Sequence, residues 1–380
     1  MGVTTKIESK MAMSLEAGKL MGSTGWGFNG NTIMSLGAND AFPYLTKNIK
    51  VNPQQQPDES IEGLAFEDLP VQIGLEAPMD SLEWNVRYDG MDKLWYWLMG
   101  YEDGGSSPED LGGGYYRKCY ELDSHERHFT AYRTAEQTAG DYNADDRKNR
   151  FGTFAFALGP NDYRYHHQLC SGFSIASTAD DGMVKCTAKA MGPKEGRADY
   201  SSSSWTYATA LQGSSNSVLH RHLTFSVKPS GGAYVELGVS NFNVEVEIPL
   251  SIKRDCESGL YIIEPTLAGQ VSVSGSFVIS RHSVDTYMGY RDSWQECVIK
   301  AVYTTGSYSW GLYFPSVVLS DASLTEEDVP THPITFNCGK EPDVSSPVFS
   351  TELSSINLIQ GGQMMILADN TNSTNEMRRE

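Results

Sequence analysis

The stretch HLTFSVKPSGGAYVELGVSNFNVEVEIPLSI (222–252) decides the fold of this chain. Its residues 241–248 alternate strictly between large apolar and polar side chains. One face carries Phe242, Val244, Val246 and Ile248, and the other carries Asn241, Asn243, Glu245 and Glu247. A period of two residues is typical of a strand with one buried and one solvated face. Segments 82–88 and 270–279 alternate in the same way, so the sequence predicts a mainly β protein.

The rest of the chain extends this pattern and adds two short helices. Further strands are expected at 151–158, 171–177, 183–190, 220–227, 296–304, 310–319 and in the apolar run Ile356–Leu367. Within residues 89–100, apolar side chains recur at helical spacing at Met91, Leu94, Trp95 and Leu98. Asp92 suits the start of that helix and Gly100 suits its end. Residues 282–290 are the candidate for a second helix.

A chain of 380 residues is long enough for about two domains. Polar, Gly- and Asn-rich residues 1–60 are predicted to form an N-terminal arm. A first β domain is expected over 61–190, with a long loop at 101–150. The linker-like residues 191–205 open a second β domain over 191–345, and residues 346–380 form a C-terminal extension.

Two near-matches suggest that the chain contains an internal repeat. MGYED (99–103) resembles MGYRD (288–292), and each follows an alternating segment and a short helix-like segment. Leu69–Ile73 similarly resembles Ile248–Ile252 in order and context. The hypothesis is a duplication of one β domain with a flanking helix; chance similarity is the alternative.

The charge balance argues against a nucleic-acid-binding protein that contacts phosphates through a basic surface. Lys and Arg total 29 against 48 Asp and Glu, which gives a net charge of −19. The acidic balance is compatible with a channel through which DNA passes without binding to the wall. No apolar stretch approaches the length of a membrane span and no secretory signal is evident, so we expect neither. The six cysteines show no metal-binding spacing and are expected to be reduced, mostly buried thiols.

No motif in the sequence favours catalysis, a cofactor or a metal. Residues 25–30 fit GxGxxG, but a polar loop precedes them where a dinucleotide site needs a strand. Histidines occur at 125, 128, 166, 167, 220 and 222, and no spacing completes a zinc site. Glu245 and Glu247 on one strand face would fit the carboxylate spacing of a glycosidase. A solvated acidic face explains that pair better, so we expect no enzyme.

The order of these elements resembles that of the major tail tube proteins of long-tailed bacteriophages. The stretches that carry the resemblance are 62–100 with its short aromatic helix, the hairpin 171–192, residues 222–279 and the strand SWGLYFPSVVLSDA (309–322). Together they span roughly 60 to 325. The match lies in the pattern of elements, because this family has no diagnostic motif to compare residue by residue. The loop 101–150 and the arm 1–60 are long for the family.

The resemblance implies two β-sandwich or barrel-like tail-tube domains, each with a short flanking helix, together with long loops and extended terminal arms. Such subunits stack as rings into a channel for genome ejection. If the chain holds two such domains, three chains would make a pseudo-hexameric ring. The resemblance also implies tape measure, tail terminator and baseplate proteins as partners, and synthesis in the host cytoplasm before incorporation into the virion tail.

The acidic residues predicted to face the lumen are Glu76, Glu83, Glu245 and Glu247, because each lies opposite an apolar face on an expected strand. An outer solvent-exposed face would have the same sequence signature. Two alternatives to a tube subunit stay open: a glycan-binding β-sandwich protein of the tail or surface, and a terminator or baseplate ring protein.

Overall fold

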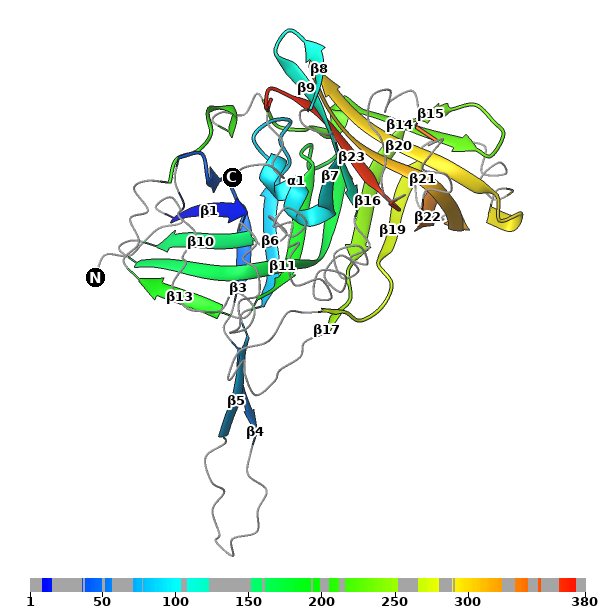
Figure 1. Ribbon diagram of the computed structural model, residues 1–380. Helices are drawn as coiled ribbons and strands as arrows, with labels where there is room; N and C mark the ends of the chain where they lie inside the picture. The colour runs from blue at the N-terminus through cyan, green and yellow to red at the C-terminus, as the bar shows by residue number, and fades with distance from the viewer. Residues whose placement is uncertain are drawn as a thin grey trace, which may run out of the picture.

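The computed structural model describes residues 9–15, 36, 38–49, 52–56, 71–76, 78–103, 108–122, 152–158, 161–192, 194–198, 205–211, 216–251, 266–279, 289, 291–322, 332–340, 348–349 and 362–373. The fold is mainly β, as predicted, and nineteen strands are joined by hydrogen bonds into one connected antiparallel system (Figure 1). The described part of the chain holds no helix with the length and apolar character that a bilayer span requires.

The largest layer, here called the main sheet, contains most of the predicted strands. In spatial order it consists of β3 (Thr46–Ile49), β6 (Met79–Asn85), β12 (Lys185–Met191), β11 (Asn161–Thr178), β16 (Val239–Glu247), β19 (Ser272–Ile279), β22 (His332–Gly339) and β21 (Tyr308–Ala322). Alternation along β16 is as the sequence predicts, because Phe242, Val244 and Val246 are buried while Glu245 and Glu247 are exposed.

The long strand β21 leaves the main sheet and enters a second sheet. Residues 316–322 of β21 pair with β22, whereas residues 309–313 pair with β23 (Met365–Asn370). The second sheet runs through β15 (Val235–Leu237), β14 (Leu223–Pro229), β20 (Glu296–Thr305), β21, β23 and β9 (Tyr115–Leu122). Both β7 (Gly100–Asp103) and β8 (Glu109–Gly112) then pair with β9. Sharing one strand brings the two sheets face to face.

The long strand β11 likewise connects the main sheet to a side group of strands, seen at the left of Figure 1. Its first half pairs with β10 (Gly152–Leu158) and β13 (Lys194–Ala198), and its second half pairs with β12 and β16. β1 (Ser9–Leu15) and β2 (Ala41–Phe42) complete the side group. Two separate hairpins are β4 (Asn52–Gln56) with β5 (Val71–Glu76), which projects from the body in Figure 1, and β17 (Leu250–Ser251) with β18 (Thr266–Leu267).

An aromatic core fills the space between the two sheets. Phe225 of β14 lies 5.3 Å from Phe242 of β16 and 4.8 Å from Phe277 of β19, measured between ring centroids. Phe314 of β21 and Phe336 of β22 continue the contact, with centroids 5.7 Å apart. Burial of such large rings is the main favourable term that holds the sheets together.

The helix α1 (Asp92–Met99) lies within residues 89–100, where the sequence predicts a helix. It packs at the centre of the molecule. Gly100 ends it in the left-handed conformation (φ 85°), and its N–H donates to the Tyr96 carbonyl. The helix is buried almost all round, not along one face only: Lys93 alone among its residues escapes full burial. Trp95 contacts Trp310 of β21, with ring centroids 5.2 Å apart. Short 3₁₀ turns occur at η4 (Thr209–Leu211) and η5 (His220–His222).

Several regions predicted as irregular are strands. The predicted loop 101–150 begins with β7, β8 and β9, the predicted linker 191–205 contains β13, and the predicted N-terminal arm contains β1, β2, β3 and β4. β22 was not predicted at all. β9 escaped notice because it is buried on both faces, so Lys118 and Glu121 occupy interior positions and break the expected alternation.

The described residues on both sides of the predicted boundary at residue 191 belong to one sheet system and share one core. β11 pairs with β16 across that boundary, and a single apolar cluster extends from Met11 to Ala368. The predicted C-terminal extension contributes β23, which lies between β9 and β21. The predicted second helix, 282–290, falls outside the described residues except for Gly289. The duplication therefore stays a prediction.

The packing of the main sheet makes the stability of the protein sensitive to substitution of Gly275. A Cβ added at Gly275 of β19 would lie 2.4 Å from the Phe336 ring and 2.6 Å from the Asn243 carbonyl oxygen. We expect Gly275→Ala to lower the free energy of unfolding by about 1–3 kcal/mol through overpacking, measured by urea denaturation. Gly238→Ala is the matched control, because nothing lies within 4 Å of its added Cβ. Equal stability of the two variants would contradict the packing described here.

Candidate functional site

The outward side of the main sheet is mostly polar and is here called the polar sheet face. Val278, Pro333 and Val318 are apolar residues that point to the same side. Each residue that points outward alternates with a buried apolar residue on the same strand. The face consists mostly of hydroxyl, amide and carboxylate side chains: Glu83, Asn85, Lys185, Thr187, Lys189, Ser174, Asn243, Glu245, Glu247, Ser272, Ser274, Ser276, Thr335 and Asn337. Among the described residues, no aromatic side chain that could stack on a sugar or a base lies on this face.

One cross-strand row of this face carries two of the predicted lumen residues. Directly opposed residues link Thr46 to Glu83, Glu83 to Thr187, Thr187 to Ser174, Ser174 to Glu245, Glu245 to Ser274 and Ser274 to Asn337. Opposed residues in antiparallel strands point to the same side of a sheet. Three strand spacings separate Glu83 from Glu245, which is about 14 Å. The Thr46 hydroxyl donates a hydrogen bond to Glu83 Oε2 at 3.1 Å.

Glu247 lies on the neighbouring row of the same face, opposite Gly172, which in turn opposes Lys189. The other cation of the face, Lys185, is held by Asp181 at 2.8 Å. A hydrogen bond from Lys185 to Asp181 raises the pKa of its ammonium group above the ordinary value. Glu76 ends β5 in the projecting hairpin, and its side chain lies outside the described residues. The structure thus brings together three of the four predicted residues.

The chemistry open to the polar sheet face is that of a solvated surface. Glu245 and Glu247 are exposed to solvent. Their charges repel anions over a Debye length of about 8 Å at physiological salt. Small hydroxyl and amide groups between the carboxylates keep the surface hydrated without concentrating positive charge on it.

The histidines at 220 and 222 lie on η5, not on a strand as predicted, and each has a hydrogen-bond partner. The Nε2–H of His220 donates to the Val239 carbonyl at 2.9 Å, so its Nδ1 accepts from the Ser177 hydroxyl at 2.8 Å. Ser177 is fully buried. This serine–histidine pair has no access to a substrate and serves packing. His222 Nδ1 lies 2.9 Å from the Tyr88 hydroxyl, and burial lowers the pKa of His222.

Within the described ranges, no group of three or more potential metal ligands comes together. Cys119, Cys170, Cys186, Cys297 and Cys338 are free thiols, and all but Cys338 are fully buried, as predicted. Burial raises the pKa of the Cys297 thiol to about 11, so it stays protonated at neutral pH. The GxGxxG pattern at 25–30, for which no dinucleotide site is predicted, lies outside the described residues. The histidines at 125 and 128 lie outside them too.

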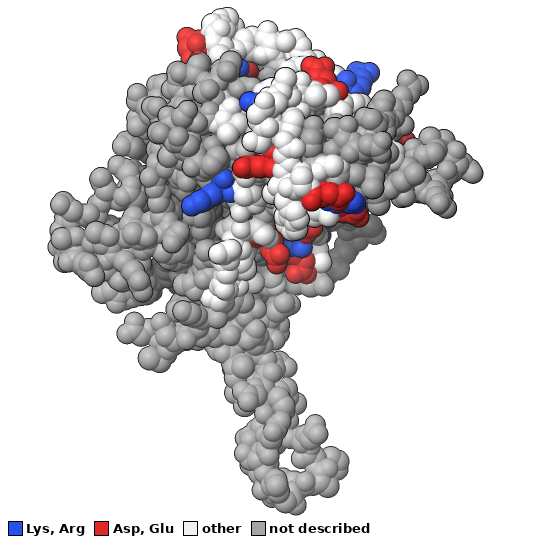
Figure 2. Space-filling view, turned by 90° about the vertical axis from the view of Figure 1, so that its right-hand side faces the viewer, with Lys and Arg blue, Asp and Glu red and all other residues white. Residues whose placement is uncertain are grey.

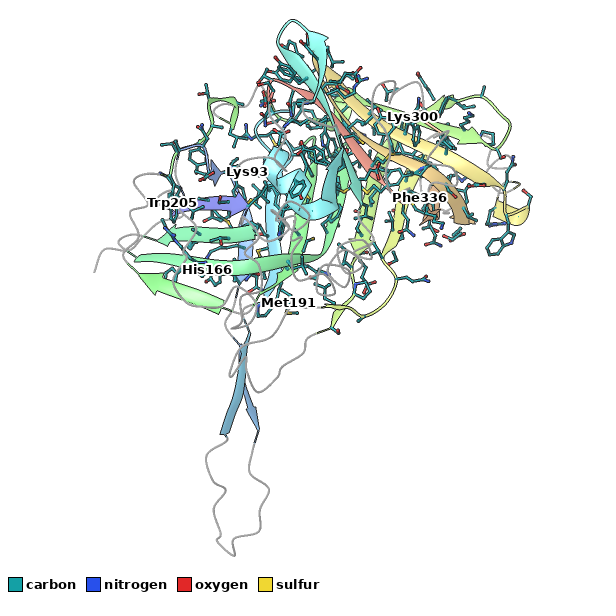
Figure 3. All side chains as sticks on the ribbon, viewed as in Figure 1. Lys93, His166, Met191, Trp205, Lys300 and Phe336 are labelled. Carbon is teal, nitrogen blue, oxygen red and sulfur yellow. The ribbon has the colours of Figure 1, made fainter. Side chains whose placement is uncertain are left out.

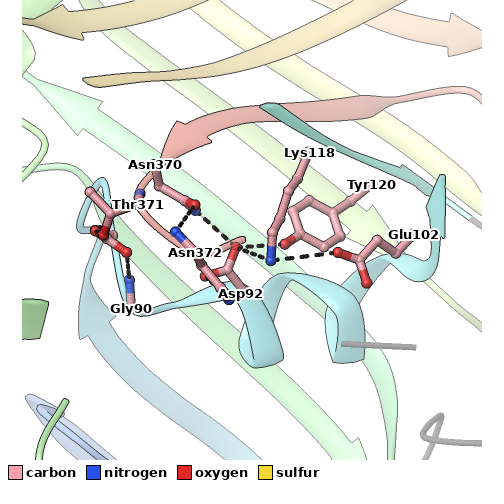
Figure 4. Close-up of polar contacts among 9 residues, drawn as sticks. Gly90, Asp92, Glu102, Lys118, Tyr120, Asn370, Thr371 and Asn372 are labelled. Carbon is pink, nitrogen blue, oxygen red and sulfur yellow. Dashed lines mark hydrogen bonds and ion pairs between the residues drawn. The ribbon is translucent and has the colours of Figure 1, made fainter. Parts of the chain in front are cut away.

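A buried polar cluster, here called the Asp92 cluster, joins side chains of α1, β7, β9 and β23 (Figure 4). Lys118 of β9 is fully buried, with its Nζ 3.3 Å from Asp92 Oδ1 and 3.7 Å from Glu102 Oε1. Asp92 also accepts hydrogen bonds from the Tyr120 hydroxyl at 2.8 Å and from Asn370 Nδ2 at 2.9 Å. The first residue of α1 is thereby bound to β9 and to the end of β23.

The residues that follow β23 add to this attachment. Asn372 Nδ2 donates to Asp92 Oδ2 at 3.1 Å, and the Thr371 hydroxyl donates to Asp89 Oδ2. One residue before the end of β23, Asp369 accepts two hydrogen bonds from Arg117, from Nε at 2.8 Å and from Nη2 at 2.9 Å. The Asp92 cluster is therefore a structural clamp on the C-terminal strand.

Burial by itself raises the pKa of Asp92, but the charge of Lys118 and the hydrogen bonds from Asn370, Tyr120 and Asn372 outweigh it and hold the pKa below its ordinary value. The folded state thus favours the ionised carboxylate. Sequence reasoning read Asp92 only as a favourable charge at a helix start. Nothing local signals its partners, because Asn370 is 278 residues away along the chain.

Neither the known protein-family models nor the curated proteins contain a match to this chain.

The Asp92 cluster predicts a pH-dependent stability. The lowered pKa means that Asp92 stabilises the fold above its unfolded value near 3.8 and ceases to do so as pH falls through the folded pKa. Asp92→Asn leaves Lys118 without this buried partner charge, so we expect it to lower the free energy of unfolding by about 3 kcal/mol at pH 7. Urea denaturation across a range of roughly pH 2.5 to 7, which includes the ordinary carboxyl pKa, should show the difference from wild type shrinking at the acid end.

The matched control for this experiment is Asp181→Asn, which breaks the exposed ion pair with Lys185. Asp181 has a side-chain exposure of 58%. An exposed pair of this kind contributes about 0–1 kcal/mol. A pH-independent difference for Asp92→Asn, or a loss no larger than that of the control, would contradict the role given to the cluster.

Proposed function

We propose that this chain is a structural subunit of a bacteriophage tail tube, which polymerises into stacked rings around a channel for DNA. The observation that carries the proposal is the polar sheet face, where Glu83, Glu245 and Glu247 lie among small hydroxyl and amide groups. The mainly β fold supports the proposal, and α1 lies within residues 62–100, one of the stretches on which the resemblance rests.

The mechanism proposed for the polar sheet face is passive. A duplex carries one negative charge per about 1.7 Å of axis, and a wall of carboxylates repels it within a Debye length. A wall that binds phosphates through lysines would instead hold the duplex by counterion release. Lys185 is paired with Asp181, and Lys189 lies across Gly172 from Glu247, so the three carboxylates of the face outnumber its two lysines. The face would therefore keep a moving duplex away from the wall.

Ring closure is proposed to use the open edges of the sheets. Among the described strands, β3 pairs only with β6 and β15 pairs only with β14, so each leaves one edge without a neighbouring strand. Edge strands with unpaired backbone groups invite pairing with another chain. Stacking of rings is a head-to-tail contact, which does not close and so grows a filament. The projecting β4–β5 hairpin would extend beyond one ring toward the next (Figure 1).

A tail tube subunit would have further protein partners in the tail. The tape measure protein would fill the growing tube, and terminator and baseplate proteins would bind its two ends. Three chains per ring, with pseudo-sixfold symmetry, follow only if the two halves of the chain are duplicated domains; six chains follow otherwise. The proposed location is the tail of the virion.

Charge reversal on the polar sheet face tests the proposal. We expect the double variant Glu245→Lys, Glu247→Lys to assemble as the wild type does, because both side chains are exposed, and to retain double-stranded DNA at low salt. Wild-type assemblies should not retain it. Assembly is followed by electron microscopy and retention by co-sedimentation of the assemblies with a labelled duplex across a salt series.

The charge-matched control is Asp110→Lys with Asp180→Lys, which alters the same net charge at two exposed residues outside this face. The control should form tubes that retain no more DNA inside than wild type, scored after nuclease removes DNA bound outside. Equal nuclease-resistant retention by both double variants would contradict a lumen at the polar sheet face. Absence of rings in the wild type, together with binding to a glycan panel, would favour the glycan-binding alternative.

A further inference from the structure

One tryptophan differs in its exposure from the other described tryptophans. Trp294 is 78% exposed, whereas the other described tryptophans are at most 2% exposed: Trp84, Trp95, Trp97, Trp205 and Trp310. Its backbone has a φ of 52°, in the left-handed region that bulky residues rarely adopt. Strain held at an exposed aromatic side chain points to a function rather than to packing.

The turn that carries Trp294 is fixed by hydrogen bonds. The Ser293 N–H and hydroxyl donate to the Gly289 carbonyl at 3.0 and 2.7 Å, and the Trp294 N–H donates to the Arg291 carbonyl at 3.0 Å. The Ser230 N–H donates to the Glu296 carbonyl at 2.9 Å, which ties the start of β20 to the turn between β14 and β15. The indole is thus presented beside the hairpin that ends the second sheet.

The charge around this corner is closer to balance than that of the whole chain, because three basic residues lie there with four acidic ones: Arg291, Lys228 and Lys300 with Asp292, Asp321, Glu236 and Glu296. Arg291 pairs with Asp292 at 2.7 Å and lies 3.9 Å from Asp321. Lys228 and Lys300 lie 5.3 and 3.8 Å from the centroid of the Tyr234 ring. Figure 3 marks Lys300 at the right of the molecule, and Figure 2 shows basic and acidic side chains interspersed among uncharged ones on that side. Two copies that each carry −19 would meet with less repulsion here.

The same corner includes an open sheet edge. β15 pairs only with β14 among the described strands, and its first residue, Val235, is 52% exposed. An exposed indole, balanced charge and an available edge strand are the features of a lateral protein contact, in which aromatic residues commonly carry most of the binding energy.

We infer that the Trp294 turn and the β14–β15 hairpin form the lateral contact with a second copy of this chain, with Trp294 as its anchor. This inference rests on the proposed function, since it names the contact through which subunits of a ring meet. It assigns a role to a residue that the polar sheet face does not use.

Sedimentation velocity over a concentration series tests the inference with Trp294→Ala, Trp294→Gly and, as matched control, Leu111→Ala. Glycine adopts a positive φ freely, so Trp294→Gly removes the indole while relieving the backbone. Leu111 is 41% exposed on β8. We expect both Trp294 variants to need at least about a tenfold higher concentration than wild type for half-assembly, and Leu111→Ala to match wild type.

The outcomes separate this inference from the proposed function. Rings formed equally by wild type and both Trp294 variants would overturn the lateral contact and leave the proposed function standing. A wild type that stays monomeric at every concentration, with no rings in the electron microscope, would overturn both. Circular dichroism of each variant confirms that a loss of assembly is not a loss of fold.

Discussion

The attachment of the C-terminal strand to the centre of the molecule is the constraint on which the rest of the structure depends. β23 fills the position between β9 and β21, so without it the second sheet would be divided in two. The Asp92 cluster holds that strand by pairing a buried carboxylate with Lys118 and with Asn370. Buried charges are tolerated only when paired and hydrogen-bonded, so the cluster admits one arrangement of helix and strands.

The sandwich that this clamp completes separates two surfaces with different properties. Between the sheets, rings such as Phe242 and Phe336 form a dry aromatic core. On the outer side of the main sheet, the alternate residues of the same strands form a hydrated face with exposed Glu245 and Glu247. Strand alternation therefore links stability to the proposed function, because the register that buries the aromatic residues also directs the carboxylates outward.

The strands that could be predicted from the sequence are those with one buried face and one solvent-exposed face. The alternation at 241–248 placed Glu245 and Glu247 correctly on the solvated side of β16. It failed where strands are buried on both sides, as in β9 with Lys118, since interior charges resemble loop composition. The alternation of apolar and polar residues also does not predict contacts between segments that are far apart in the sequence. The Asp92 cluster arises from tertiary pairing, which no local pattern encodes. The exposure of Trp294 likewise has no signature in the alternation of apolar and polar residues.

Helical image reconstruction of filaments assembled from the purified chain would show directly which surface lines the channel. We expect a hollow tube of stacked rings whose inner wall is the polar sheet face, with Glu245 and Glu247 directed into the channel. A tube whose channel is lined by another surface, or a protein that forms no closed rings, would contradict this expectation.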